Sequence, residues 1–112
     1  MAARSKLSML LVLAAVVAVA YMGYLFMQHF RRAGGYAEVS RGMNEAAVIA
    51  AMGSPDRRNA GCRDAPSWDG VRVTETRCAF QFIYQDPFAP RFWAVGFDDR
   101  GLVMAKADYI SP

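Results

Sequence analysis

The first thirty residues and the rest of the chain differ in how apolar and polar positions alternate. No charged residue occurs from Leu7 to Gln28. As a helix rising 1.5 Å per residue, this run is about 33 Å long, which is enough to cross a bilayer core of about 30 Å. Two tyrosines near its far end and three basic residues beyond it fit an interfacial belt followed by a polar stop: Tyr21, Tyr24, His29, Arg31 and Arg32. We therefore predict a membrane anchor over residues 1–30.

A cleaved secretory signal is the alternative interpretation of the same run. Ala18-Val19-Ala20 satisfies the small-x-small rule for a cleavage site. Cleavage there would leave an apolar new terminus beginning at Tyr21, which is unusual for a soluble product, so we favour the uncleaved anchor. No cysteine follows the run closely, so the attachment signal of a lipoprotein is absent.

A linker and one short helix are expected next. Residues 31–35 end in two glycines and predict a flexible exit from the membrane. A first short helix over Tyr36 to Ser40 is possible before Gly42. Asn44 is a good N-cap, and Glu45 places negative charge at the positive end of a helix dipole. Apolar residues at helical spacing follow, and a glycine and a proline supply the exit: Met43, Ala47, Val48, Met52, Gly53 and Pro55.

From Thr76 onward the period changes from helical to alternating. Aromatic and apolar residues alternate with polar ones over residues 78–85, with Ile83 as a misfit, and again from Phe92 to Phe97. A third strand is expected from Leu102 to Ala107, and Val71 to Val73 could add an edge. Three sequential strands with short links predict an antiparallel meander on which the helices pack. The fold class is therefore α+β, a small two-layer domain over residues 36–112.

Charge distribution and motif content argue against several classes of function. The 112 residues carry 13 basic and 10 acidic side chains, a net charge of +3 with a pI near 9.1, and the charges are scattered rather than clustered as in a nucleic-acid-binding protein. The only histidine, His29, flanks the predicted anchor, and the adjacent Asp98 and Asp99 fit a turn better than a shared-proton pair. No phosphate-binding loop is present. We expect no enzyme activity, no cofactor and no metal.

Cys62 and Cys78 are the only cysteines, sixteen positions apart. A disulfide across this loop would remove roughly 3 kcal/mol of unfolded-chain freedom in the entropic model, which is large for a small domain. Two unpaired thiols are the alternative. A metal site is disfavoured because no CxxC spacing occurs and the one histidine lies at the membrane end. We favour the disulfide, which implies an oxidising compartment.

Short motifs in the domain resemble the SmpA/OmlA (BamE-like) family of bacterial envelope proteins. Gly-Met, a capping residue, an acidic residue, a valine and Met-Gly-Ser-Pro match its first part, and an aromatic residue, Asp and a glycine turn match its last. The matching positions are Gly42, Met43, Val48, Gly53, Pro55, Phe97, Asp98 and Gly101. The resemblance covers roughly residues 39–108 and implies a β-lactamase-inhibitor-protein-like fold with a role in outer-membrane protein assembly or envelope integrity.

The orientation of the anchor needs more than charge counting. Arg4, Lys6 and the amino terminus face Arg31, Arg32 and the more distant Arg41, so the positive-inside rule does not distinguish the two orientations. The cysteines and the family resemblance decide between them. We predict a single-pass inner-membrane protein with its carboxy-terminal domain in the periplasm.

Aromatic and arginine residues near the loops are candidate partner contacts, because these residue types anchor protein interfaces. We select Trp68, Arg77, Phe88, Arg91, Phe92 and Tyr109. Completion of a small core is the competing explanation for each of them. As a group they predict a binding or scaffold domain that is an accessory subunit of an envelope complex, with oligomeric state open. The alternative is an inhibitor or immunity protein that blocks a partner enzyme.

Overall fold

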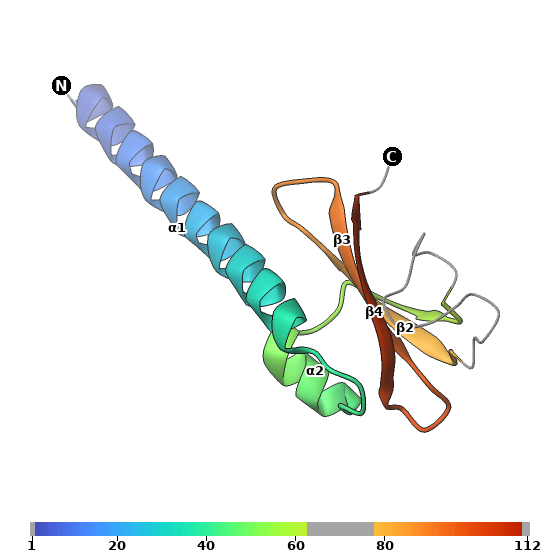
Figure 1. Ribbon diagram of the computed structural model, residues 1–112. Coiled ribbons are helices and arrows are strands. Elements are labelled where there is room, and N and C mark those ends of the chain that lie inside the picture. Colours follow the sequence, from blue (N-terminus) through green and yellow to red (C-terminus); the bar gives the residue numbers. More distant parts are fainter. Residues whose placement is uncertain (1, 63–77, 111–112) are drawn as a thin grey trace.

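The structure is a computed structural model that describes residues 2–62 and 78–110. Its described part contains two helices and four strands (Figure 1): α1 Ala2–Glu38, α2 Glu45–Met52, β1 Arg57–Ala60, β2 Phe80–Gln85, β3 Arg91–Phe97 and β4 Val103–Ile110. The long apolar α1 extends away from the domain, and the shorter α2 lies beside its carboxy-terminal end (Figure 1). The predicted contacts Trp68 and Arg77 and the possible strand Val71 to Val73 lie outside the described residues.

Helix α1 continues through the segment that we expected to be a linker. Residues 31–35 lie inside α1, so the flexible exit predicted from the paired glycines is wrong in this structure. The reason is a close helix crossing. A Cβ on Gly35 would lie 2.3 Å from the carbonyl oxygen of Ala51 and 2.9 Å from Cγ of Met52. Gly35 therefore permits α2 to approach α1, whereas Gly34 is exposed and has no such neighbour.

Helix α2 has the start and stop that its sequence predicts. The side chain of Asn44 accepts a hydrogen bond of 2.8 Å from the amide of Ala47 and caps the first turn. Gly53 ends the helix with φ of +89°, a backbone conformation that favours glycine. Its amide donates a hydrogen bond to the carbonyl of Ile49. Val48 and Met52 are buried against the sheet.

The sheet is a four-stranded antiparallel meander in the order β1-β2-β3-β4. We expected three strands. The additional strand β1, Arg-Arg-Asn-Ala, pairs with β2 from Arg57 opposite Ile83 to Ala60 opposite Phe80. It is a short polar edge strand without apolar alternation, so periodicity does not reveal it. The three predicted strands pair with one another as expected, with a bulge at Gly96 and Phe97.

The two faces of the sheet carry different apolar clusters. The helix-facing cluster contains the residues Val39, Val48, Met52, Phe82, Tyr84, Trp93, Val95, Phe97 and Val103. On the outer face Ile83 packs with Ala94 and Ala107, and Phe92 and Tyr109 border them. Ile83 is fully buried, so its departure from strict alternation reflects a second apolar face.

The motif residues of the two ends of the domain meet in the structure. The amide of Gly42 donates to the carbonyl of Val103 at 3.0 Å, and the amide of Val103 donates to the carbonyl of Met43 at 2.8 Å. Asp98 forms the β3–β4 turn by accepting from the amides of Arg100 and Leu102. Gly101 completes this turn with φ of +76°. Gly42 and Met43 thus join the segment before α2 to β4, and Asp98 and Gly101 form the turn that precedes β4.

Cys62 and Cys78 form a disulfide with their Cα atoms 5.9 Å apart. The bond joins the chain just after β1 to the chain just before β2. Next to it, the amide of Gly61 donates to the carbonyl of Ala79 at 2.9 Å. The disulfide therefore reinforces the pairing of the edge strand with the sheet.

Alanine at the two adjacent glycines tests whether α1 is continuous. Gly35→Ala forces α2 away and should destabilise the protein by about 1–3 kcal/mol. Gly34→Ala should stabilise it by about 0.5–1 kcal/mol, because alanine favours the helix and meets no neighbour. The measurement is urea unfolding of the full chain in detergent micelles, followed by tryptophan fluorescence. Equal small effects at both positions would indicate a flexible linker instead.

Candidate functional site

The junction, where the last third of α1 meets the sheet, contains two pairs of charged or ionisable side chains. The pairs are Arg32 with Asp56, and His29 with Asp86. Each pair joins α1 to a segment far away in the sequence. The junction therefore fixes the domain on the helix that carries the apolar run.

Arg32 is the central residue of the junction. The residue is only 7% exposed, and its guanidinium donates to both carboxylate oxygens of Asp56, at 2.8 and 3.2 Å, and to the carbonyl of Gln85. Asp56 also accepts from the amide of Gln85 at 2.7 Å. The planar fork of arginine suits such a bidentate contact. One side chain thus ties α1 to the start of β1 and the end of β2.

Tyr84 lies beneath this network with its ring 5.5 Å from the Arg32 guanidinium. Its hydroxyl donates to the carbonyl of Gly53 at 2.8 Å and so ties β2 to the end of α2. Burial raises the pKa of Tyr84 to about 12, while the neighbouring Arg32 acts in the opposite direction. The neutral phenol is the form that the fold accommodates.

His29 and Asp86 join α1 to the hairpin between β2 and β3. His29 Nδ1 lies 3.0 Å from Oδ2 of Asp86, whose side chain is almost fully buried. The other oxygen of Asp86 accepts from the amide of Phe88 at 2.9 Å. A buried carboxylate needs such partners because desolvation of a charge is costly. In this arrangement the pair holds the hairpin against the helix.

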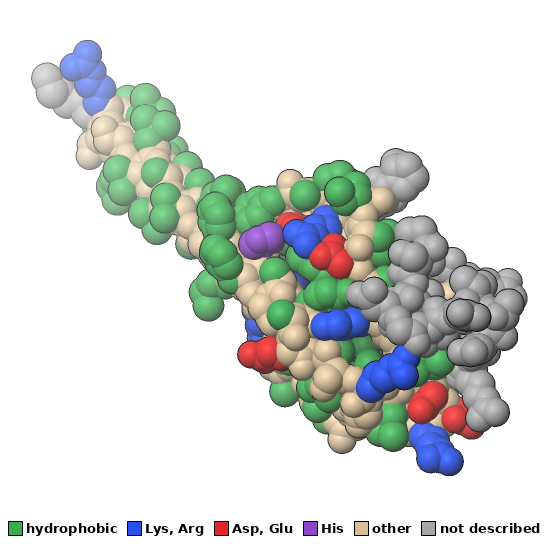
Figure 2. All heavy atoms as spheres, viewed as in Figure 1, with side chains coloured by type: hydrophobic (Ala, Val, Ile, Leu, Met, Phe, Trp, Pro, Cys, Tyr) green, Lys and Arg blue, Asp and Glu red, His purple; other side chains and the backbone are tan. Residues whose placement is uncertain are grey.

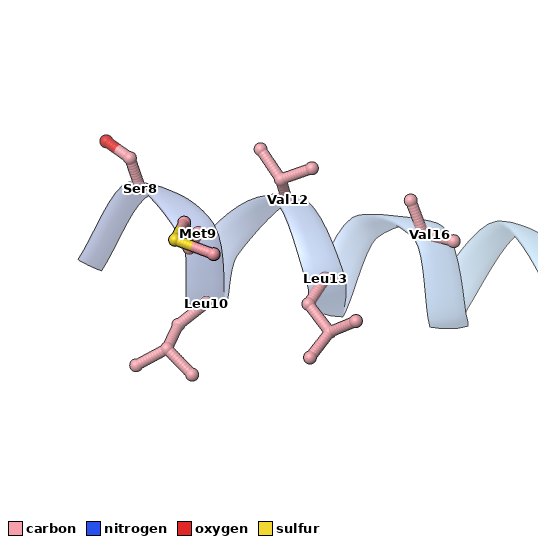
Figure 3. A pocket seen from close by; sticks show the side chains of 6 residues that line it. All are labelled: Ser8, Met9, Leu10, Val12, Leu13 and Val16. Atoms are coloured by element: carbon pink, nitrogen blue, oxygen red, sulfur yellow. The ribbon is translucent and has the colours of Figure 1, made fainter. Parts of the chain in front are cut away.

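Two hollows lie along α1. A polar cleft between α1 and the end of α2 is lined by Tyr24, Gln28, Arg31, Arg32, Met52, Gly53 and Ser54. Its guanidinium, amide and hydroxyl groups can hydrogen-bond a polar or anionic group. Figure 3 shows the other hollow, which is formed by side chains of α1 alone from Ser8 to Val16 and is apolar apart from Ser8. Its residues belong to the predicted anchor.

The structure separates the four described residues among those that we selected as partner contacts. Phe92 and Tyr109 are cross-strand neighbours on the outer face, with their rings stacked 5.5 Å apart. Arg91 precedes Phe92 in β3 and therefore points to the opposite face, where its guanidinium lies 5.2 Å from the Trp93 ring. Phe88 lies elsewhere, on the β2–β3 hairpin against α1. The expected single binding face is thus divided into three places.

Arg91 has a carboxylate partner at the end of β4. Its Nε donates to Oδ1 of Asp108 at 2.8 Å, and a second guanidinium nitrogen donates to the other oxygen. The hydrogen bond from Arg91 lowers the pKa of Asp108 below its usual range, and Asp108 in turn raises that of Arg91. A partner that used Arg91 would have to compete with this pair.

Sequence reasoning missed the residues that build the junction. Asp56 and Asp86 were not selected, and Arg32 was interpreted only as part of a polar stop after the anchor. The pairs are separated by 24 and 57 positions, so no local pattern connects them. An acidic residue beside a strand end and an arginine behind an apolar run are too common to predict a contact.

Comparison with known proteins gives a structural similarity and no sequence match. No family model and no curated protein matches the sequence. Among solved structures, the chain is similar to one described as a putative osmotically inducible lipoprotein, OsmE. The similarity has a TM-score of 0.48 at 17% identity and covers 73% of this chain and 82% of that chain. Membership of a family therefore stays a prediction from the motifs.

Replacing Asp56 and replacing Arg32 should lower the free energy of unfolding by different amounts. Asp56→Ala leaves a buried guanidinium without its carboxylate and should cost about 2–3 kcal/mol. Arg32→Met replaces the buried charge by an apolar chain and leaves a half-exposed Asp56 that water can solvate, so it should cost under about 1.5 kcal/mol. Urea unfolding in micelles measures both. A larger cost for Arg32→Met than for Asp56→Ala would contradict the claim that the unpaired buried charge, rather than the lost contacts, is the main cost.

The raised pKa of Tyr84 predicts a loss of stability at alkaline pH. Because the folded pKa lies above that of the unfolded chain, the contribution of Tyr84 is fully present below about pH 10 and is lost as the pH rises toward about 12. Tyr84→Phe should remove this part of the decline and flatten the dependence of the unfolding free energy on pH. Parallel declines in the two proteins would show that the hydroxyl titrates normally.

Proposed function

We propose that the protein is a single-pass membrane protein that holds a small α+β binding domain at the bilayer surface, where it is an accessory or scaffold subunit of an envelope complex. The domain faces the periplasm in this proposal, and the anchor lies in the inner membrane. The protein acts by position and has no chemical step of its own.

The observation that carries the proposal is the exposure of the apolar part of α1. The helix is long and apolar enough to cross a membrane, by length and composition, and the most apolar part of it is not covered by the domain. Large side chains such as Leu11, Val19 and Met27 are 64–75% exposed. A row of such residues is costly in water, and a bilayer would cover it. A signal sequence would pass the same test, so cleavage has to be measured.

The continuity of α1 supports a positional mechanism. The same helix that carries the apolar run contributes Arg32 to the junction, and Val39 just beyond its end is buried in the core. No break separates the two parts, so the domain would stand at a fixed height above the membrane. Confinement to the bilayer surface raises the effective concentration near a membrane partner.

The partner is expected to dock on the outer face of the sheet, at the end that carries Phe92 and Tyr109. This end lies next to the β2–β3 hairpin, whose tip contacts α1. The stacked rings are half-buried at the border of a cluster whose members are themselves buried, so a partner would contact the rings and not the cluster. Aromatic residues commonly anchor protein interfaces. A partner bound there would itself lie close to the membrane.

The envelope role rests on the motif resemblance and on the disulfide. The motifs are similar to those of the SmpA/OmlA family, which favours outer-membrane protein assembly or envelope integrity. The Cys62 and Cys78 disulfide favours an oxidising compartment such as the periplasm. The lack of a lipid-attachment cysteine after the apolar run argues for the inner membrane.

Fractionation of cells that produce the full chain tests the proposal. We expect the protein to stay with membranes after alkaline carbonate extraction, at the mass of the uncleaved chain. Its cysteines should react with a thiol reagent only after reduction. Replacing residues 1–28 by a cleavable secretory signal should release the domain from the membrane. A mature chain that has lost the apolar run would contradict the anchor.

Cross-linking and co-purification with the full chain test the docking surface. Phe92→Ala should reduce recovery of the membrane partner, while Arg100→Ala in the distant β3–β4 turn is the matched control and should leave recovery unchanged. Loss of the anchor should also reduce recovery, because it removes the gain in effective concentration. Stoichiometric binding to a soluble enzyme that survives removal of the anchor would favour the inhibitor alternative.

A further inference from the structure

The tip of the β2–β3 hairpin is apolar and exposed. Residues 87–90 read Pro-Phe-Ala-Pro. Phe88 is 43% exposed, and Ala89 and Pro90 are also exposed. Turns in water favour Gly, Asn, Asp and Ser beside Pro, and this one has no polar side chain at its tip. The core of the domain does not require an exposed phenylalanine at this place.

The hairpin tip lies beside the end of the apolar run of α1. The rings of Phe88 and Phe26 have centroids 4.7 Å apart. Phe26 lies two residues before Gln28, the end of the uncharged run, so it is only about 3 Å along the helix axis from that end. If the run occupies the hydrocarbon core, the tip is at the boundary between the core and the headgroups.

The depth of the tip is fixed by contacts at the base of the hairpin. The side chain of His29 contacts Asp86, the residue that follows β2. Arg32 donates to the carbonyl of Gln85, the last residue of β2. Both contacts come from the two turns of α1 that follow Phe26. The hairpin therefore cannot move along the helix without breaking the junction.

The backbone of the tip suits a site of low polarity. Two of its four residues are prolines, which have no amide hydrogen to satisfy. The amide of Phe88 donates to Asp86, and the amide of Asp86 donates to the carbonyl of Arg91 at 2.9 Å. Unpaired amide and carbonyl groups are what exclude most loops from the hydrocarbon core, and the tip, with few amides to satisfy, suits the interfacial region, where water and headgroups can reach its carbonyls. The carboxyl group of Asp86 is turned inward toward His29, whereas Phe88, Ala89 and Pro90 are exposed.

The tip is part of a larger exposed aromatic patch. Phe30 on the next turn of α1 is 67% exposed, and its ring lies 6.4 Å from that of Phe26. Figure 2 shows hydrophobic side chains gathered around the histidine where α1 enters the domain. We define Phe26, Phe30 and Phe88 as the aromatic patch.

We propose that the hairpin tip is a second membrane-contacting element, with the aromatic patch inserted in the interfacial region of the bilayer that α1 crosses. This inference rests on the proposed anchor. The insertion fixes the tilt of the domain and thereby directs the outer face of the sheet along the membrane surface. Lipid is the occupant because the patch is continuous with the lipid-facing surface of α1.

Spin labels on single introduced cysteines test the depth of the tip. The full chain, with its disulfide intact, is reconstituted in phosphatidylcholine vesicles with a label at Ala89→Cys. Labels at Val12→Cys and at Arg100→Cys are the controls for the bilayer interior and for water. Collision rates with oxygen, which concentrates in lipid, and with a water-soluble nickel chelate are measured by electron paramagnetic resonance.

Each outcome supports or overturns the inference. A ratio of oxygen to nickel collision rates at position 89 that lies well above the ratio at position 100, and at or below the ratio at position 12, supports insertion in the interfacial region. High nickel rates, as at position 100, overturn it and leave the anchor intact. Low rates with both probes also overturn it, because they indicate cover by protein. If position 12 is exposed to nickel, the anchor itself fails and the inference fails with it.

A second variant tests whether Phe88, rather than the spin label at position 89, holds the hairpin tip in the bilayer. Phe88→Asp places a charge at the tip and should raise the nickel collision rate of the label at position 89 severalfold. Asp99→Asn in the distant β3–β4 turn is the control and should leave that rate unchanged. An equal rate in the Phe88→Asp protein would show that Phe88 does not hold the tip in lipid, which overturns the proposal.

Discussion

The position of the domain relative to α1 depends on the hydrogen bonds that neutralise the buried charge of Arg32. Arg32 is only 7% exposed, and a buried guanidinium is tolerated only where good hydrogen-bond partners replace water. Asp56 and the carbonyl of Gln85 supply these partners from two segments that the sheet brings together. The helix that carries the apolar run is therefore connected to the domain by a contact with defined geometry.

The close packing of the helices adds to this contact. Gly35 lets α2 cross α1 at a distance that no side chain would allow, and Tyr84 joins the end of α2 to β2. The His29 and Asp86 pair then sets the height of the β2–β3 hairpin on α1. Each of these contacts removes one way for the domain to move on its helix. A domain held in this way has a fixed orientation relative to α1.

The sequence predicted those parts of the fold whose causes are local. Asn44 and Gly53 bound α2 because capping acts within one turn. Alternation revealed the strands from Phe80 onward because each buries at least one face. The polar edge strand β1 has no such pattern and was missed.

The candidate site was less predictable because its causes are tertiary. Gly34 and Gly35 look alike in the sequence, and only the approach of α2 gives Gly35 its role. Alternation places Arg91 and Phe92 on opposite faces, so that part of the separation was within reach of sequence reasoning. The pairing of Arg32 with Asp56 was not, because it depends on the arrangement of α2 and β2 in space.

The rigid connection of α1 to the domain is the central claim, and one distance measurement tests it most directly. Spin labels at Val17→Cys in the apolar run and at Arg100→Cys in the β3–β4 turn report the separation of helix and domain in lipid nanodiscs by pulsed electron paramagnetic resonance. A continuous helix with the junction formed predicts one narrow distance distribution, which broadens in Asp56→Ala. A broad distribution in the unmodified background would mean that the domain pivots about residues 31–35, which contradicts the account.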